Sequence, residues 1–142
     1  MPLLLEIVTP ERLAYSDTVD SVQLPGVEGE LGVLPHHAPL VSMLGVGELR
    51  IRKGGAEESF AIVGGFLQVL PDKVVVMAET ADLASEIDLE KAQEARRQAE
   101  AALESGYHEG ADLSAARAAL QQALIRIRVA ERRHREGPRR RS

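Results

Sequence analysis

The four histidines are the first candidates for chemistry, because an imidazole can act as a general base or as a metal ligand. Only His36 and His37 are adjacent, whereas His108 and His134 stand alone. Neighbouring residues of an extended chain point to opposite sides, so this pair is poorly placed to bind one metal ion. The sequence has no cysteine and no serine, histidine and acid arrangement that would suit nucleophilic catalysis. We therefore predict no catalytic residue and no metal site.

Glycine-rich loops that bind phosphate are the second kind of site to consider. The sequence lacks the Gly-x-x-x-x-Gly-Lys-Ser/Thr pattern of nucleotide hydrolases. The glycines at 45, 47, 54 and 55 do not lie between a strand and a helix, which is the context that a phosphate loop needs. We therefore expect no nucleotide hydrolysis by this chain alone.

Segment 24–35 has a glycine at every third position around two glutamates; these residues are Gly26, Gly29, Gly32, Glu28 and Glu30. This spacing is typical of a tightly curled, exposed loop, with Leu31 or Val33 turned back inward. An exposed acidic tip is usually just solvated, and it can also be a docking loop. Composition alone leaves both interpretations open.

Charge is segregated along the 142-residue chain, which is 44% hydrophobic and carries a net charge of −5. Residues 1–86 have a net charge of −8, and residues 87–142 have a net charge of +3. Nine arginines and only two glutamates fall within residues 113–142. The overall acidity and the four aromatic residues disfavour a nucleic-acid binder that uses the whole molecule, although the basic segment keeps a local interaction open.

These residues must be positioned by two different kinds of structure. Residues 1–86 indicate about eight short strands in all, with turns at 53–56 and 71–72; the strand candidates that can be bounded are 3–8, 12–15, 18–24, 49–52, 60–63, 66–70 and 74–77. We therefore predict an N-terminal antiparallel β-sandwich, or a flattened barrel, over residues 1–86. The fold class is α+β, because helices follow the strands.

Residues 87–142 predict a two-helix antiparallel hairpin. Asp88 can cap the first helix, which ends near Ser105, and Asp112 can cap the second, which runs to a stop at Gly137. The first helix offers mostly alanine to the seam, so the contact buries little apolar area. We hypothesise that the hairpin can either fold down or open, and that these two states differ in free energy by a few kcal/mol. A permanently closed hairpin is the alternative.

Several runs of residues resemble the epsilon subunit of F-type ATP synthases. They are residues 28–40 (EGELGVLPHHAPL), 47–51 (GELRI), 63–66 (VGGF), 87–92 (IDLEKA) and 120–131, which contains RIRV at 126–129. The resemblance covers the chain except for the variable tail 132–142.

The resemblance implies a subunit of the rotor stalk that couples proton translocation to ATP synthesis and has no active site of its own. Its partners would be the gamma subunit and the c-ring, and also the alpha and beta subunits when the hairpin is extended. By position, the resemblance assigns the docking residues as Glu28, Gly29, Glu30, Leu31 and His37. The first four belong to the loop that meets the c-ring in relatives, and His37 falls near the gamma contact.

The resemblance also implies that the second helix restrains ATP hydrolysis through basic residues. Arg128, Arg132 and Arg135 lie at steps of four and three, with Arg126 and Arg133 close beside them. In relatives, basic residues here meet acidic loops of the catalytic subunits. The alternative interpretation is a solvated helix end, where cations are favourable in any case.

Some relatives bind ATP through an Ile/Leu-Asp-x-x-Arg-Ala motif. The matching run here contains Asp88, Lys91 and Ala92, with lysine where arginine is expected, so a bidentate contact to phosphate is lost but the charge is kept. Further candidates for this site are Asp82, Arg97, Arg126 and Arg128. ATP is thus a candidate regulatory ligand, no cofactor is required, and Asp88 as a mere helix cap is the alternative.

A second function stays open beside the first: a free-standing nucleotide- or nucleic-acid-binding module that uses the arginine-rich helix. The acidic sandwich counts against it. Residues 1–8 lack a basic region and a long apolar run, so we expect neither a signal peptide nor a transit peptide. We expect no direct insertion into a membrane, and a peripheral location on the cytoplasmic face of the bacterial cell membrane through the ATP synthase complex.

Overall fold

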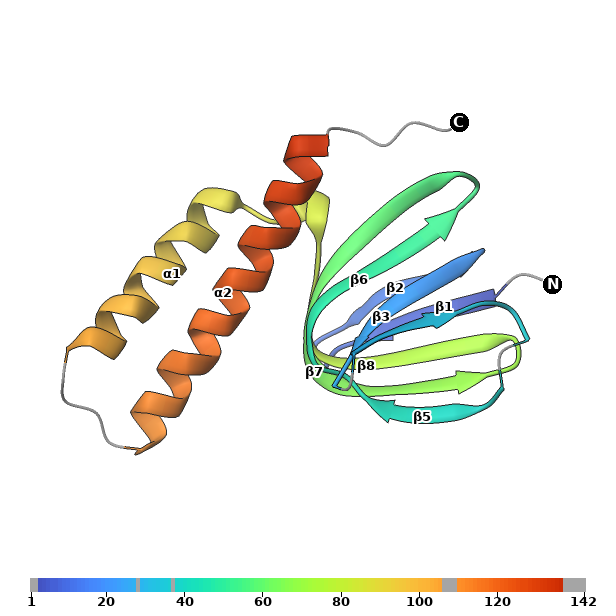
Figure 1. The fold of residues 1–142 in the computed structure, drawn as a ribbon, viewed down its shortest axis with the longest axis horizontal. Coiled ribbons are helices and arrows are strands. Elements are labelled where there is room, and N and C mark those ends of the chain that lie inside the picture. Colours follow the sequence, from blue (N-terminus) through green and yellow to red (C-terminus); the bar gives the residue numbers. More distant parts are fainter. Residues whose placement is uncertain (1–2, 28, 37, 106–109, 137–142) are drawn as a thin grey trace.

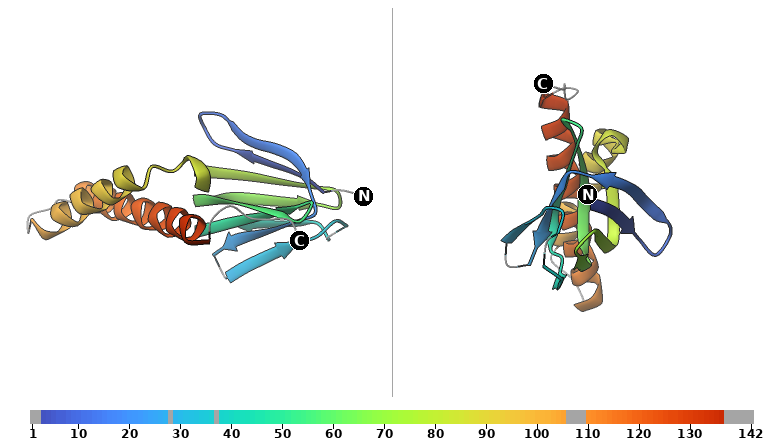
Figure 2. Two further views of the ribbon diagram at one scale, coloured as in Figure 1. Left: turned by 90° about the horizontal axis from the view of Figure 1, so that it is seen from above. Right: turned by 90° about the vertical axis from the view of Figure 1, so that its right-hand side faces the viewer.

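The computed structural model describes residues 3–27, 29–36, 38–105 and 110–136. It consists of a β-sandwich and a helical hairpin that extends from one end of it, as Figure 1 shows. Seen from above, the hairpin continues the long axis of the sandwich (Figure 2). The predicted α+β class is confirmed, and the predicted division at residue 86 stays a prediction.

Eight strands form the sandwich: β1 (Leu3–Val8), β2 (Leu13–Val19), β3 (Ser21–Gly26), β4 (Gly29–Val33), β5 (Leu40–Met43), β6 (Val46–Lys53), β7 (Ala56–Leu70) and β8 (Lys73–Leu83). The hydrogen-bonded order is β2-β1-β8-β7-β6-β3-β4, and β5 pairs with β7. The predicted hairpins β6–β7 and β7–β8 are confirmed. The described strands pair antiparallel, as predicted, except that β1 runs parallel to β8.

A single long strand, β7, joins the two parts of the sandwich. Its first part pairs with β6 and its last part with β5. The sequence predicted two strands here, separated at Gly64 and Gly65; both glycines have a positive φ and carry the strand through an irregularity instead of ending it. A Cβ atom on Gly65 would overlap the carbonyl oxygen of Met77, so this position requires glycine.

The core lies between the sheet faces and is built by alternation along each strand. In β1, Leu3, Leu5 and Ile7 are fully buried while the residues between them are partly exposed. Branched and aromatic side chains from the other strands complete one continuous cluster, to which Tyr15 and Phe60 add an edge-to-face ring contact. Such a closely packed core makes the sandwich a stiff support.

A short 3₁₀ turn, η1 (Ala84–Glu86), leads from β8 to α1 (Leu89–Glu104), and α2 (Gly110–Glu136) returns towards the sandwich. Asp88 caps α1 as predicted, since its Oδ1 accepts a hydrogen bond from the Lys91 backbone N–H at 3.1 Å. The predicted cap Asp112 lies inside α2, which begins two residues earlier. The turn residues 106–109 and the predicted stop at Gly137 lie outside the described residues.

The seam of the hairpin consists largely of alanine, as predicted. Ala92 and Ala99 of α1 are buried, as are Ala116 and Ala123 of α2. Neither described helix is long and apolar enough to cross a membrane.

Candidate functional site

The helical hairpin is attached to the sandwich through a small apolar contact, separate from the main core. Ile125 and Val129 of α2 pack against Ala61 of β7 and Ala84 of η1. The two α2 residues are four positions apart and therefore lie on the same helix face. Because this contact is small, polar interactions beside it contribute to the attachment.

One ion pair lies beside the apolar contact, at the end of β8. The Nε atom of Arg126 donates a hydrogen bond to Oδ2 of Asp82 at 2.8 Å. About one third of each side chain is exposed, 33% for Arg126 and 30% for Asp82, so solvent weakens the pair without removing it.

A second and less exposed group of charges lies further along α2. Arg132 donates from Nε to Oε2 of Glu48 on β6 at 2.8 Å, and its guanidinium also donates to Oγ of Ser59 on β7 at 2.8 Å. Glu57 of β7 lies 3.5 Å from the same guanidinium. We call these four residues the Arg132 network. Because Glu48 is only 4% exposed and Arg132 16%, this network is better shielded from water than the Asp82–Arg126 pair.

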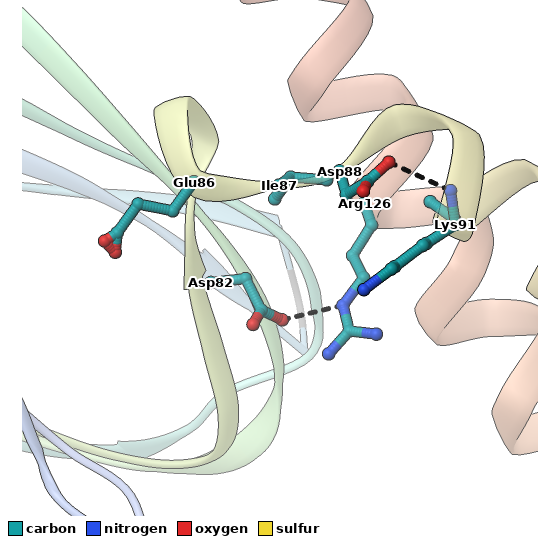
Figure 3. A pocket seen from close by; sticks show the side chains of 7 residues that line it. Asp82, Glu86, Ile87, Asp88, Lys91 and Arg126 are labelled. Atoms are coloured by element: carbon teal, nitrogen blue, oxygen red, sulfur yellow. Dashed lines mark hydrogen bonds and ion pairs between the residues drawn. The ribbon is translucent and has the colours of Figure 1, made fainter.

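A pocket of about 210 Å³ opens where β8, the start of α1 and α2 meet. It is lined by Asp82, Glu86, Ile87, Asp88, Lys91, Ala92 and Arg126. Figure 3 shows the Lys91 side chain extending from α1 towards Arg126, while the carboxylate of Glu86 points away from both. Two cationic groups therefore lie on one side of the pocket, with the Asp82 carboxylate next to them.

The structure brings together five of the seven residues proposed for ATP, namely Asp82, Asp88, Lys91, Ala92 and Arg126. The other two, Arg97 and Arg128, do not line this pocket. Arg97 forms an ion pair with Glu94 on the exposed face of α1, and this hydrogen bond lowers the pKa of Glu94. Arg128 lines a different pocket, which also includes Gly29 and Glu30. In this conformation Arg97 and Arg128 lie outside the pocket that contains Asp88, and their part in an ATP site stays a prediction.

The size and charge of the pocket limit what it can hold. Sites for whole small molecules usually measure about 300–1,000 Å³, so about 210 Å³ suits only part of a nucleotide, such as its phosphates. An anion would have to compete with Asp82 for Arg126, because these two already form an ion pair. Among the described residues, no group of three or more acids or histidines is arranged to hold a metal ion.

The predicted docking loop lies at the β3–β4 turn. Glu30 is exposed, and Leu31 is partly buried against the core, so the glutamate faces outward as expected. Gly29 has a φ of 130°, with open space where a Cβ would lie. Glu28 and His37 lie outside the described residues.

An exposed apolar strip crosses three neighbouring strands, near the end of the sheet where the β3–β4 turn lies. It consists of Val41, Met43, Phe66 and Met77, whose exposed fractions are 70%, 54%, 51% and 47%. Met43 is the cross-strand partner of Phe66, and Phe66 is the partner of Met77, so the three side chains form a row. Sequence reasoning missed this strip, because each residue taken alone resembles a core position.

Sequence reasoning also missed Glu48, Glu57 and Ser59. A signal was present: Glu48, Arg50 and Arg52 alternate along β6, so they share a face and predict a charged strip. Their partner on α2 is 84 residues away in sequence from Glu48, and no local pattern identifies it.

Comparison with known families gives matches in both halves of the chain. Residues 2–84 match the family described as "ATP synthase, Delta/Epsilon chain, beta-sandwich domain", and residues 85–131 match "ATP synthase, Delta/Epsilon chain, long alpha-helix domain".

Curated relatives and a solved structure agree with these matches. A protein of Dehalococcoides mccartyi named ATP synthase epsilon chain is 47% identical over 131 residues, which cover 92% of this chain and 94% of the relative. One of the same name from Syntrophobacter fumaroxidans is 50% identical over 127 residues, covering 89% and 94%. A chain in the OSCP/F1/c-ring structure of the Euglena gracilis mitochondrial ATP synthase is 27% identical, with a TM-score of 0.75, covering 87% of this chain and 78% of that one.

The apolar contact beneath α2 can be tested with the substitution Ile125→Ala. Alanine keeps the helix propensity high, so the change removes packing at a side chain that is 6% exposed and leaves the helix intact. Truncating a buried isoleucine costs about 2–5 kcal/mol, and we expect amide hydrogen exchange in the second half of α2 to accelerate by at least about tenfold. The neighbouring Leu124→Ala is the control, because Leu124 is 46% exposed. Equal exchange in both variants would contradict the contact.

Proposed function

The chain belongs to the ATP synthase delta/epsilon family, and from this we propose that it is a rotor subunit that transmits torque and regulates hydrolysis through its helical hairpin. It is an epsilon-type subunit of the central stalk and not itself an enzyme. The observation that carries the coupling role is the exposed apolar strip on a sandwich whose interior is closely packed. A rotor part must pass on force without deforming, which such a core permits.

We propose two docking surfaces on the sandwich. The apolar strip of Val41, Met43, Phe66 and Met77 contacts the gamma subunit, because contiguous exposed apolar side chains typically mark protein interfaces. The tip of the β3–β4 turn, with Gly29 and Glu30, contacts the c-ring, as the resemblance implies. Leu31 supports this tip from the core side, and Glu28 belongs to the same loop, whereas His37 is proposed for the gamma contact.

We propose that the hairpin inhibits ATP hydrolysis when it leaves the sandwich and extends towards the alpha and beta subunits. Its basic residues would then meet acidic partner loops. In the conformation described here, Arg126 and Arg132 are paired with carboxylates of the sandwich, whereas Arg128 and Arg133 are exposed. The side chain of Arg135 lies outside the described residues. The pairing of two of these arginines supports a conformation in which the hairpin does not inhibit.

We propose further that ATP stabilises this docked conformation. The pocket joins β8, α1 and α2, so a phosphate bound there would connect all three elements. Lys91 and Arg126 supply the positive charge, and the ion pair of Arg126 with Asp82 weakens the attraction. Since the pocket accommodates only part of a nucleotide, we expect weak binding without a dedicated metal ion.

The alternative of a nucleic-acid-binding module gains no support from the geometry. Arg126 and Arg132 turn towards acidic residues of the sandwich, which leaves fewer arginines for phosphate contacts. We propose a peripheral location at the cytoplasmic face of the bacterial membrane, through the other subunits of the complex.

The ring contact can be tested with Glu30→Lys. Reversal of an exposed charge at an interface introduces repulsion or removes attraction, and we expect binding to the rotor to weaken by about tenfold, which is about 1.4 kcal/mol. Proton-driven ATP synthesis in reconstituted vesicles should fall accordingly. The control is Glu11→Lys, an exposed site in the β1–β2 connection away from the turn. Normal synthesis with Glu30→Lys would argue against this docking surface.

The inhibitory role can be tested by removing residues 113–142. We expect ATP hydrolysis by the assembled enzyme to rise, because the segment that carries the basic residues is gone. The comparison is enzyme assembled with the full chain at the same stoichiometry. Unchanged hydrolysis would refute inhibition by this segment.

The ATP site can be tested by calorimetry on the full isolated chain. We expect heat on titration with millimolar ATP. Lys91→Arg should bind ATP more tightly, because a planar guanidinium can donate two hydrogen bonds to one phosphate, and Lys91→Gln should bind ATP about tenfold more weakly. Lys73→Gln serves as the control, since Lys73 pairs with Glu6 on the sandwich. Absence of heat in every variant would dismiss the ATP site.

A further inference from the structure

Glu48 is an unusual residue for a sandwich surface, because its carboxylate is almost completely covered. Its side chain is 4% exposed, although it lies on β6 at the side where α2 packs. A buried charge is costly unless it is paired and hydrogen-bonded. A buried Glu48 therefore needs cationic partners, and with the hairpin docked α2 supplies one of them beside Arg50 of the sandwich.

Arg132 supplies this cation with a specific geometry. Its Nε donates to both oxygens of Glu48, at 3.1 and 2.8 Å, while the guanidinium also reaches Ser59 and Glu57. A planar guanidinium with several N–H donors in a fixed arrangement recognises carboxylates better than a point charge does. The network thus fixes the position of α2 along β6 and β7.

The sandwich also provides substitutes for Arg132. Arg50 lies 3.4 Å from Glu48, and Arg52 lies 3.7 Å from Glu57, both measured between side-chain N and O atoms. Departure of α2 would expose both glutamates to water and leave each beside an arginine of β6. Breaking a buried ion pair is usually very unfavourable because it leaves an isolated buried charge. Undocking of the hairpin leaves no such charge.

We propose that Glu48 and Glu57 form an intramolecular binding site for Arg132 that holds the hairpin against the sandwich, and that these glutamates compete with acidic partner segments for the same guanidinium. Arg132 has one guanidinium plane and cannot satisfy both sets of carboxylates at once. The sandwich thereby limits how readily the hairpin extends. The competition rests on the proposed inhibitory function, whereas the holding role does not.

The holding role is tested by a distance measurement on the full chain. Because the chain has no cysteine, spin labels can be placed through Glu11→Cys on the sandwich and Gln121→Cys on α2, both at exposed sites. Glu48→Gln and Arg132→Gln should each lower the ratio of docked to undocked molecules by at least about tenfold. Added salt should undock the labelled parent and have much less effect on these variants.

Matched controls separate the network from general effects of charge. Glu58→Gln changes an exposed glutamate next to Glu57, and Arg117→Gln changes an exposed arginine of α2. Both should keep the parental distances. Arg132 lies on α2 and outside the core of the sandwich, so Arg132→Gln guards against misfolding of the Glu48 variant. Parental distances in both Glu48→Gln and Arg132→Gln would overturn the proposal.

The competition is tested by ATP hydrolysis of the assembled enzyme. Glu48→Gln should lower hydrolysis, because it releases a hairpin that still carries Arg132. Arg132→Gln should release the hairpin without lowering hydrolysis, because the shared cation is gone. Equal inhibition by both variants would overturn the competition. Shifted distances with no effect of any variant on hydrolysis would support the holding role and contradict the proposed inhibition.

Discussion

The attachment of the second half of α2 to the sandwich is the interaction on which the behaviour of this chain depends. It combines a small apolar contact around Ile125 and Val129 with the Asp82–Arg126 pair and the Arg132 network. The apolar part is small, and the charged parts are specific but sensitive to salt and to competing ions. Such an attachment is suited to a few discrete positions of the hairpin.

The proposed movement of the hairpin requires a sandwich that remains rigid. Its core is continuous from β1 to β8, and β7 runs through both parts of the sheet because Gly64 and Gly65 accommodate the irregularity. A rigid sandwich keeps Glu48, Glu57 and Asp82 in place, so the carboxylates that receive α2 are preorganised. The seam between α1 and α2, made of alanine, lets the helices pack closely with modest adhesion.

Much of the fold could be predicted from the sequence, since it follows from local signals. The cap Asp88, the turns at 53–56 and 71–72 and the two helices result from patterns within a few residues. The parallel pairing of β1 with β8 and the unbroken β7 depend on distant contacts and were missed. In the pocket, Lys91 was proposed from the motif at 87–92 and Asp82 and Arg126 as further candidates, whereas Glu48 was missed because its partner is 84 residues away.

The most direct test of this account is the distribution of distances between the sandwich and α2 within the assembled ATP synthase, measured with and without ATP. The account predicts two populations whose ratio changes with nucleotide, the docked one being favoured by ATP. A single distance that does not respond to nucleotide would contradict it, because the hairpin would then be a fixed part of the rotor.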